Sequence, residues 1–197
     1  HDGSIAGTPA SDTVTIQNAT PAASAVEFMP ANPTAQDIIS CAYVFSDSDN
    51  DADQSAIDWD VGGTSYGSGP TLSGGLVRGD IVTCTVNPDD GQATGAPVSA
   101  SITIANSAPV IGSVSIIPAQ PVVGDSLTCS EAGTTDIDGD SNFTASYQWS
   151  INGVFVHSGA QLNGGFVGGD SVLCSVVVSD GQDTSSAMTS AVSVDHS

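Results

Sequence analysis

The chain repeats itself, and this feature constrains its fold more than any other. Residues 2–30, DGSIAGTPASDTVTIQNATPAASAVEFMP, return as residues 90–118, DGQATGAPVSASITIANSAPVIGSVSIIP, at an offset of 88. After one loop the offset becomes 90, so that Trp59 matches Trp149. A period of this length is that of a whole domain and not of a short solenoid repeat. The sequence therefore predicts two complete repeats, 20–106 and 107–197, after residues 1–19, which match the last strand of a repeat.

Each repeat has the residue pattern of an all-β sandwich. Short runs rich in Val, Ile, Thr and Ser alternate apolar with polar residues, and Gly, Pro, Asn and Asp interrupt these runs at short intervals. The turns Gly62-Gly63 and Asn152-Gly153 predict tight antiparallel hairpins. Seven strands are expected in each repeat: 24–28, 37–45, 56–61, 64–67, 71–73, 80–87 and 98–105, then 112–117, 125–131, 144–151, 154–158, 160–162, 170–178 and 188–194.

Each repeat also contains one pair of cysteines in strand-like surroundings. None has the CxxC spacing of a zinc site. We predict one disulfide within each repeat, and a pair of reduced, buried cysteines is the alternative. Disulfides of this kind imply an oxidising compartment outside the cytoplasm. The predicted pairs are Cys41 with Cys84 and Cys129 with Cys174.

The charge of the chain excludes several classes of partner. Against 22 acidic residues stands a single base, Arg78, which gives a formal net charge of -21. Such a chain repels nucleic acid and anionic membrane surfaces. No apolar run approaches the roughly 20 residues that span a bilayer, so no direct membrane insertion is expected. No motif joins a Ser, His and Asp set, and we expect no enzymatic activity.

The order of cysteine and tryptophan resembles the immunoglobulin fold. A Cys lies on the second expected strand of each repeat, the Trp follows on the third, and the other Cys lies on the sixth. Val82 and Val172 stand where that fold often has the tyrosine of its tyrosine corner. Further motifs are the Asp-rich stretch, the Gly-Asp before the second Cys, the later Asp-Gly and the Asn-x-Ala-Pro of residues 106–109. With these motifs, both repeats are similar to the tandem Ig-like, PKD-like or cadherin-like repeats of large bacterial surface and secreted proteins. The resemblance implies an extracellular or cell-surface location, with bacterial origin.

Acidic residues gather between the second and third strands of each repeat. Alternate Asp residues can turn their carboxylates onto one ion, and Ca²⁺ takes six to eight such oxygens. In an immunoglobulin sandwich this loop shares an end with the turn between the last two strands and with the incoming linker, which here carries Asn18 or Asn106. We therefore expect Ca²⁺ at each joint, where it would stiffen the array; a solvated acidic turn is the alternative. The candidate ligands are Asp47, Asp49, Asp51, Asp53 and Asp90 in the first repeat, and Asp136, Asp138, Asp140 and Asp180 in the second.

The first residues of the chain add a candidate for assembly. Val14 and Ile16 match Ile102 and Ile104 of the last strand of the first repeat. This terminal strand could add to the sheet edge of a neighbouring copy and generate a head-to-tail filament. It could also continue a longer array, or fold back on the first repeat.

These features predict a structural repeat of an extracellular filament or of a cell-surface stalk or adhesin. Two alternatives remain open at the level of sequence. The loops at one end could bind a carbohydrate or a protein, with Phe143 as the main exposed aromatic residue, or the chain could be a non-catalytic spacer of a secreted enzyme.

Overall fold

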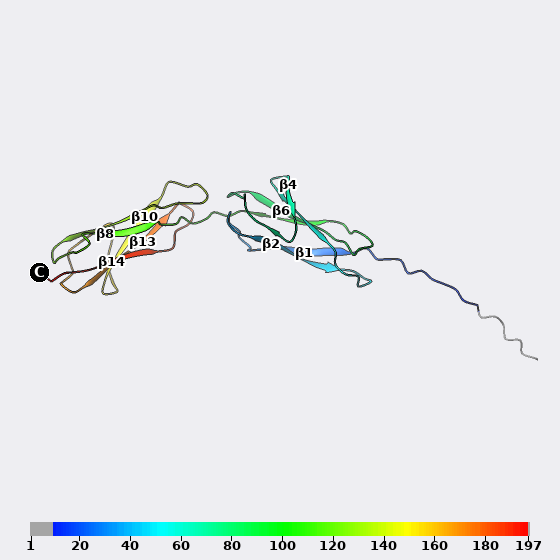
Figure 1. The fold of residues 1–197 in the computed structure, drawn as a ribbon, viewed down its shortest axis with the longest axis horizontal. Helices are drawn as coiled ribbons and strands as arrows, with labels where there is room; N and C mark the ends of the chain where they lie inside the picture. Colours follow the sequence, from blue (N-terminus) through cyan, green and yellow to red (C-terminus); the bar gives the residue numbers. More distant parts are fainter. Residues whose placement is uncertain (1–9, 197) are drawn as a thin grey trace, which may run out of the picture.

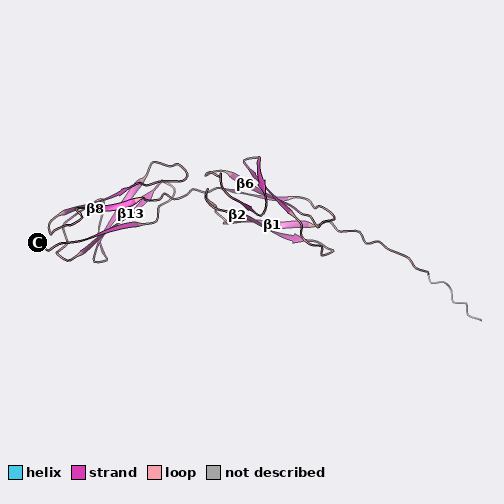
Figure 2. Cartoon of the chain, viewed as in Figure 1, coloured by secondary structure: helices cyan, strands magenta, loops and turns pink. Residues whose placement is uncertain are grey.

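Two β-sandwiches follow one another along the chain. A computed structural model describes residues 10–196, in which the two sandwiches lie end to end along the long axis (Figure 1). All regular elements of this part of the chain are strands (Figure 2). Residues 10–196 therefore offer no helix that is long and apolar enough to cross a membrane. We call β1–β7 the first module and β8–β14 the second module.

The two modules have the same sheet topology, with every strand pair antiparallel. In each, a three-stranded sheet of the first, second and fifth strands accompanies a four-stranded sheet of the fourth, third, sixth and seventh. The first module has β1 (Ala22–Met29), β2 (Ile39–Ser46), β3 (Ala56–Val61), β4 (Thr64–Ser68), β5 (Thr71–Leu72), β6 (Ile81–Asn87) and β7 (Val98–Thr103). The second has β8 (Ser113–Ile117), β9 (Ser126–Ala132), β10 (Thr144–Ile151), β11 (Val154–Ser158), β12 (Gln161–Asn163), β13 (Ser171–Ser179) and β14 (Met188–Ser193).

One disulfide joins the two sheets in each module. Cys41 on β2 is bonded to Cys84 on β6, and Cys129 on β9 is bonded to Cys174 on β13. The predicted pairing is confirmed, as is the all-β immunoglobulin-like class, because this arrangement of strands and cystine is that of an immunoglobulin-like sandwich. A bridge that closes 43 or 45 residues stabilises a fold by about 4 kcal/mol through the entropy of the unfolded chain.

A buried tryptophan packs beside each cystine. Trp59 and Trp149 are 2% and 0% exposed, and each is paired in register with the cysteine of the neighbouring strand. Their indole N–H groups donate to the carbonyls of Gly69 and Gly159, at 2.8 and 2.9 Å. The tryptophans are therefore core residues whose only polar atom is satisfied.

The position that holds the tyrosine of a tyrosine corner is part of the same core in each module. Val82 and Val172 are fully buried, so aliphatic packing replaces the aromatic residue at this position in both modules.

Residues 10–21 do not form the expected terminal strand. This segment leads away from the first module in an extended path (Figure 1), and Val14 and Ile16 are 82% and 80% exposed. Residues 10–16 therefore do not fold back on the first module. A strand requires a neighbour that accepts and donates its backbone hydrogen bonds, and none lies beside residues 10–17. The expected strand residues 1–9 lie outside the described part of the chain.

Candidate metal site at the acidic end of each module

The predicted acidic residues gather at the end of each module that receives the preceding segment of the chain. In the first module this end is formed by the β2–β3 loop, the β6–β7 turn and residues 18–19. We call the group Asp47, Asp49, Asp51 and Asp90 the first acidic end. The corresponding group in the second module, which we call the second acidic end, is Asp136, Asp138, Asp140 and Asp180.

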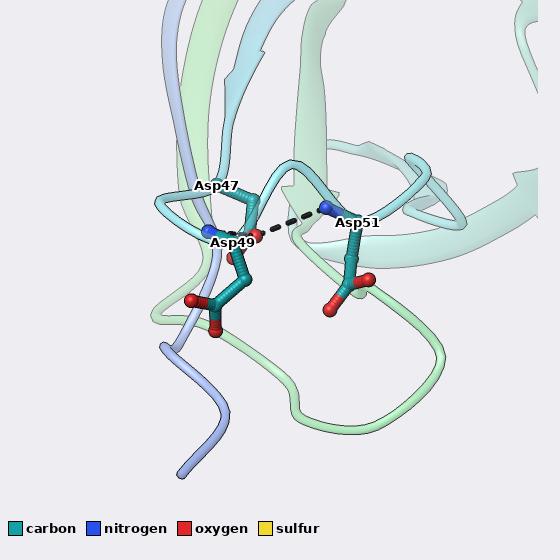
Figure 3. Close-up of side chains that lie close together, drawn as sticks. All are labelled: Asp47, Asp49 and Asp51. Atoms are coloured by element: carbon teal, nitrogen blue, oxygen red, sulfur yellow. Dashed lines mark hydrogen bonds between the residues drawn. The ribbon is translucent and has the colours of Figure 1, made fainter. Parts of the chain in front are cut away.

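Asp47 organises the β2–β3 loop through its own side chain. Its Oδ1 atom accepts hydrogen bonds from the backbone N–H groups of Asp49 and Asp51, at 2.8 and 3.2 Å (Figure 3). Asp and Asn side chains commonly hold turns in this way, and Asn50, between the two donors, has a positive φ of 61°. These contacts place Asp49 and Asp51 close to Asp47, which explains why acids at alternate positions converge.

The incoming segment is fastened to the same end by two hydrogen bonds. The backbone N–H of Ala19 donates to Asp49 Oδ2 at 2.6 Å, and Asn18 Nδ2 donates to Asp90 Oδ2 at 2.9 Å. Asp90 is only 4% exposed, and its other oxygen accepts from the backbone N–H groups of Gln92 and Ala93. The Asn18 amide, followed by the Ala93 N–H, holds the pKa of Asp90 below its usual range, so Asp90 is a stable anion.

The second acidic end repeats this arrangement. Asp136 Oδ1 accepts from the N–H of Asp138 at 2.7 Å, and Asp138 Oδ2 accepts from the N–H of Ser107 at 2.6 Å. Asn106 Nδ2 donates to Asp180 Oδ2 at 2.9 Å and is the main cause of a lowered pKa of Asp180. Asn106 and Ser107 thus do for the second module what Asn18 and Ala19 do for the first.

Six of the nine predicted ligands fall into two close triads. One carboxylate oxygen from each member of a triad lies within 4.8 Å of the others. The triads are Asp47, Asp49 and Asp51, and Asp136, Asp140 and Asp180.

The other three predicted ligands have different contacts. Asp53 is turned to Tyr43, whose hydroxyl donates to it at 2.9 Å, and to the N–H of Ser55. Asp90 and Asp138 hold the incoming segments and belong to neither triad.

Three carboxylate oxygens in these ends are buried without a hydrogen-bond partner. They are Oδ2 of Asp47, Oδ2 of Asp136 and Oδ1 of Asp138. The first two are equivalent atoms in the two modules, because the other oxygen of each Asp accepts from the N–H two residues later. An ionised oxygen that is removed from water without a donor is costly. A hard cation would remove this cost, so the residues present fit Ca²⁺.

The sequence did not predict one contact of the second acidic end, which is made by Arg78 of the first module. Its guanidinium, on the turn before β6 of the first module, pairs with Asp140 of the second module at 2.5 Å and donates to Asn106 of the linker. The available signal was that Arg78 is the chain's single base and that Gly168 occupies its place in the second repeat.

Phe143 is not the exposed aromatic residue that a ligand-binding loop would need. It is partly buried and packs against the core of the second module.

Comparisons with known proteins give no family. No family model and no curated protein matches the sequence. Solved structures with a similar arrangement include three N-terminal domains of the Hoc outer capsid protein of bacteriophage RB49, with a TM-score of 0.48, 13% identity, and coverage of 90% of this chain and 71% of that chain. A two-domain fibronectin type III segment of chicken tenascin has a TM-score of 0.44 and 11% identity, with 87% and 98% covered. The FN1–FN3 domains of chicken CNTN1 have a TM-score of 0.38 and 10% identity, with 89% and 68% covered.

The class of the protein follows from its own topology. The chain is a tandem array of immunoglobulin-like sandwiches, each with one disulfide between its sheets.

Proposed function

We propose that this chain is a structural segment of an extracellular or cell-surface filament, stalk or adhesin of bacterial origin, in which Ca²⁺ stiffens the joints between sandwiches. The end-to-end arrangement of the modules (Figure 1) and the two disulfides support a rod that works in an oxidising compartment. The net charge of -21 opposes contact with nucleic acid. The role is mechanical and adhesive rather than catalytic.

The observation that carries the calcium proposal is the recurrence of one buried, unpartnered carboxylate oxygen. Asp47 Oδ2 and Asp136 Oδ2 occupy the same place in modules whose sequences have otherwise diverged. Both atoms lie in triads whose oxygens could face one ion. A binding site for a divalent cation at each end would explain why both modules keep this arrangement.

Ca²⁺ would act on the joint because the same loops hold the incoming chain. The N–H of Ala19 donates to Asp49, and the N–H of Ser107 donates to Asp138. Repulsion among the carboxylates loosens these loops when no cation is present. A bound ion would hold the carboxylates together, and the linker would then leave the module in one direction.

Calorimetric titration of metal-free protein with Ca²⁺ tests this function. We expect saturable binding, together with a smaller spread of molecular dimensions in X-ray scattering when Ca²⁺ orders the segment that precedes the first module. Asp47→Asn should remove binding at the first acidic end. Asp58→Asn, on the exposed side of β3, should leave binding unchanged. Absence of binding at millimolar Ca²⁺ would refute the calcium proposal.

We further propose that residues 12–17 add as a strand to a sheet edge of a neighbouring copy. In support, Val14 and Ile16 alternate as strand residues do but are almost fully exposed, whereas Ile104, which matches Ile16, is 1% exposed. Electron microscopy with and without a chelator should show filaments, and Val14→Thr with Ile16→Thr should shorten them. Equal filament lengths for both proteins, or separate particles from the unaltered protein, would refute strand addition.

A further inference from the structure

Arg78 connects three parts of the molecule at the joint between the modules. Its Nη1 atom lies 2.5 Å from Asp140 Oδ2 in the second module and 2.5 Å from Asn106 Oδ1 in the linker. Its Nη2 atom lies 3.3 Å from Asp140 Oδ1, so the guanidinium contacts both carboxylate oxygens. The paired side chains are 32% and 29% exposed, which means that much of the pair is withdrawn from water. A forked contact of this kind fixes direction as well as distance.

The guanidinium also lies in the field of three carboxylates of the second acidic end. The hydrogen bond to Asp140, followed by the charges of Asp140, Asp138 and Asp136, raises the pKa of Arg78 above its ordinary value. Arg78 therefore supplies one fixed positive charge to the same carboxylates that form the candidate metal site.

Among residues 10–196, no Lys or Arg side chain contacts the first acidic end. Asp51 corresponds to Asp140, since each is the third acid of its loop, and Asp51 Oδ2 accepts only from the neutral side-chain amide of Gln92, at 3.0 Å. Arg78 is the only Lys or Arg of the chain, so no second side chain with a permanent positive charge is present to take this role in the same molecule. The two ends thus share their fold and differ in charge.

We propose that Arg78 is the resident cation of the second acidic end: it holds the two modules together without a metal and competes with Ca²⁺ for Asp140. This inference rests on the proposed calcium function, and it assigns the tighter Ca²⁺ site to the first acidic end. Even with the screening of bulk water, a unit charge about 6 Å from a divalent ion lowers the affinity for that ion about tenfold. The joint between the modules should then stay aligned in a chelator, while the segment before the first module should not.

The test is a Ca²⁺ titration of the full chain in four forms. The unaltered protein should show one tighter site, which Asp47→Asn abolishes, and one site about tenfold weaker. Arg78→Gln, which removes the charge but keeps a side chain of similar length, should strengthen the weaker site about tenfold. Arg78→Lys, which keeps the charge, should leave the weaker site weak.

Each outcome of the titration has a separate meaning. Two sites of equal affinity that Arg78→Gln does not change would overturn the inference and leave the calcium function standing. No binding by any form would overturn the calcium function itself.

A second measurement examines the joint without any metal. In a chelator, X-ray scattering of Arg78→Gln should show a wider spread of dimensions than the unaltered protein, and added Ca²⁺ should reverse the change. Identical scattering of the two proteins in the chelator would overturn the role of Arg78 as a metal-independent connection.

Discussion

Loss of the second disulfide should destabilise one module selectively. The perturbation is the double substitution Cys129→Ala with Cys174→Ala. The bond joins β9 to β13 across a sequence separation of 45 residues, and its cysteines are 2% and 0% exposed. Loop entropy contributes about 4 kcal/mol, and removal of two buried sulfur atoms adds roughly 1 kcal/mol. A domain has a free energy of unfolding of only about 5–15 kcal/mol, so the second module should come close to unfolding.

The assay is urea unfolding followed by tryptophan fluorescence. Trp149 is 0% exposed and lies beside the second disulfide, so it reports on the second module alone when Trp59→Phe removes the other indole. The free energy of unfolding obtained from the Trp149 transition should fall by several kcal/mol, and the urea midpoint should fall with it. The matched control, Cys41→Ala with Cys84→Ala, should leave the Trp149 transition nearly unchanged.

Two results would refute this reasoning. A loss below about 1 kcal/mol would mean that the unfolded chain gains little freedom when the bridge is absent. An equal shift of the Trp149 transition in the matched control would mean that the modules unfold as one unit, and the contact of Arg78 with Asp140 would then be far stronger than a partly exposed ion pair.

Two further predictions concern single contacts. Hydrogen bonds from the Val167 N–H and then from the Asn152 amide lower the pKa of Asp170. The stability that these bonds contribute is complete above a pH of about 4, and it is lost as the pH falls through the lower pKa of the folded state. Asn152→Asp should raise the pKa of Asp170 in an NMR titration; an unchanged pKa would exclude the amide as a cause. Gly95→Ala should lower the free energy of unfolding, measured by thermal unfolding, by about 1–3 kcal/mol, because the new methyl group would meet the carbonyl oxygen of Pro21. Ala96→Ser, at the next and exposed position, should leave that free energy unchanged.

The sequence by itself determined the strands, the disulfides and the class of the fold. Alternation of apolar residues and turn-forming residues are local properties, and the repeat displays each of them twice. Strand β3 was predicted with the bounds that the structure has, while β1 begins at Ala22 instead of residue 24 because a hydrogen-bonded partner, and not the side-chain pattern, decides where a strand ends. The pairing of the cysteines could be predicted from the sequence, because each repeat has one pair and its strand faces meet across the sandwich.

Only the tertiary structure decided how the charged residues are grouped. It places Asp53 with Tyr43, gives Asp90 and Asp138 the task of holding the incoming chain, and brings Arg78 to Asp140 across 62 residues of sequence. Spacing along the chain predicts which side chains share a loop, but the contact of one module with the next depends on how two folded bodies meet. The direction of a long polar side chain at such a joint is set by partners from both bodies, and neither repeat contains that information alone.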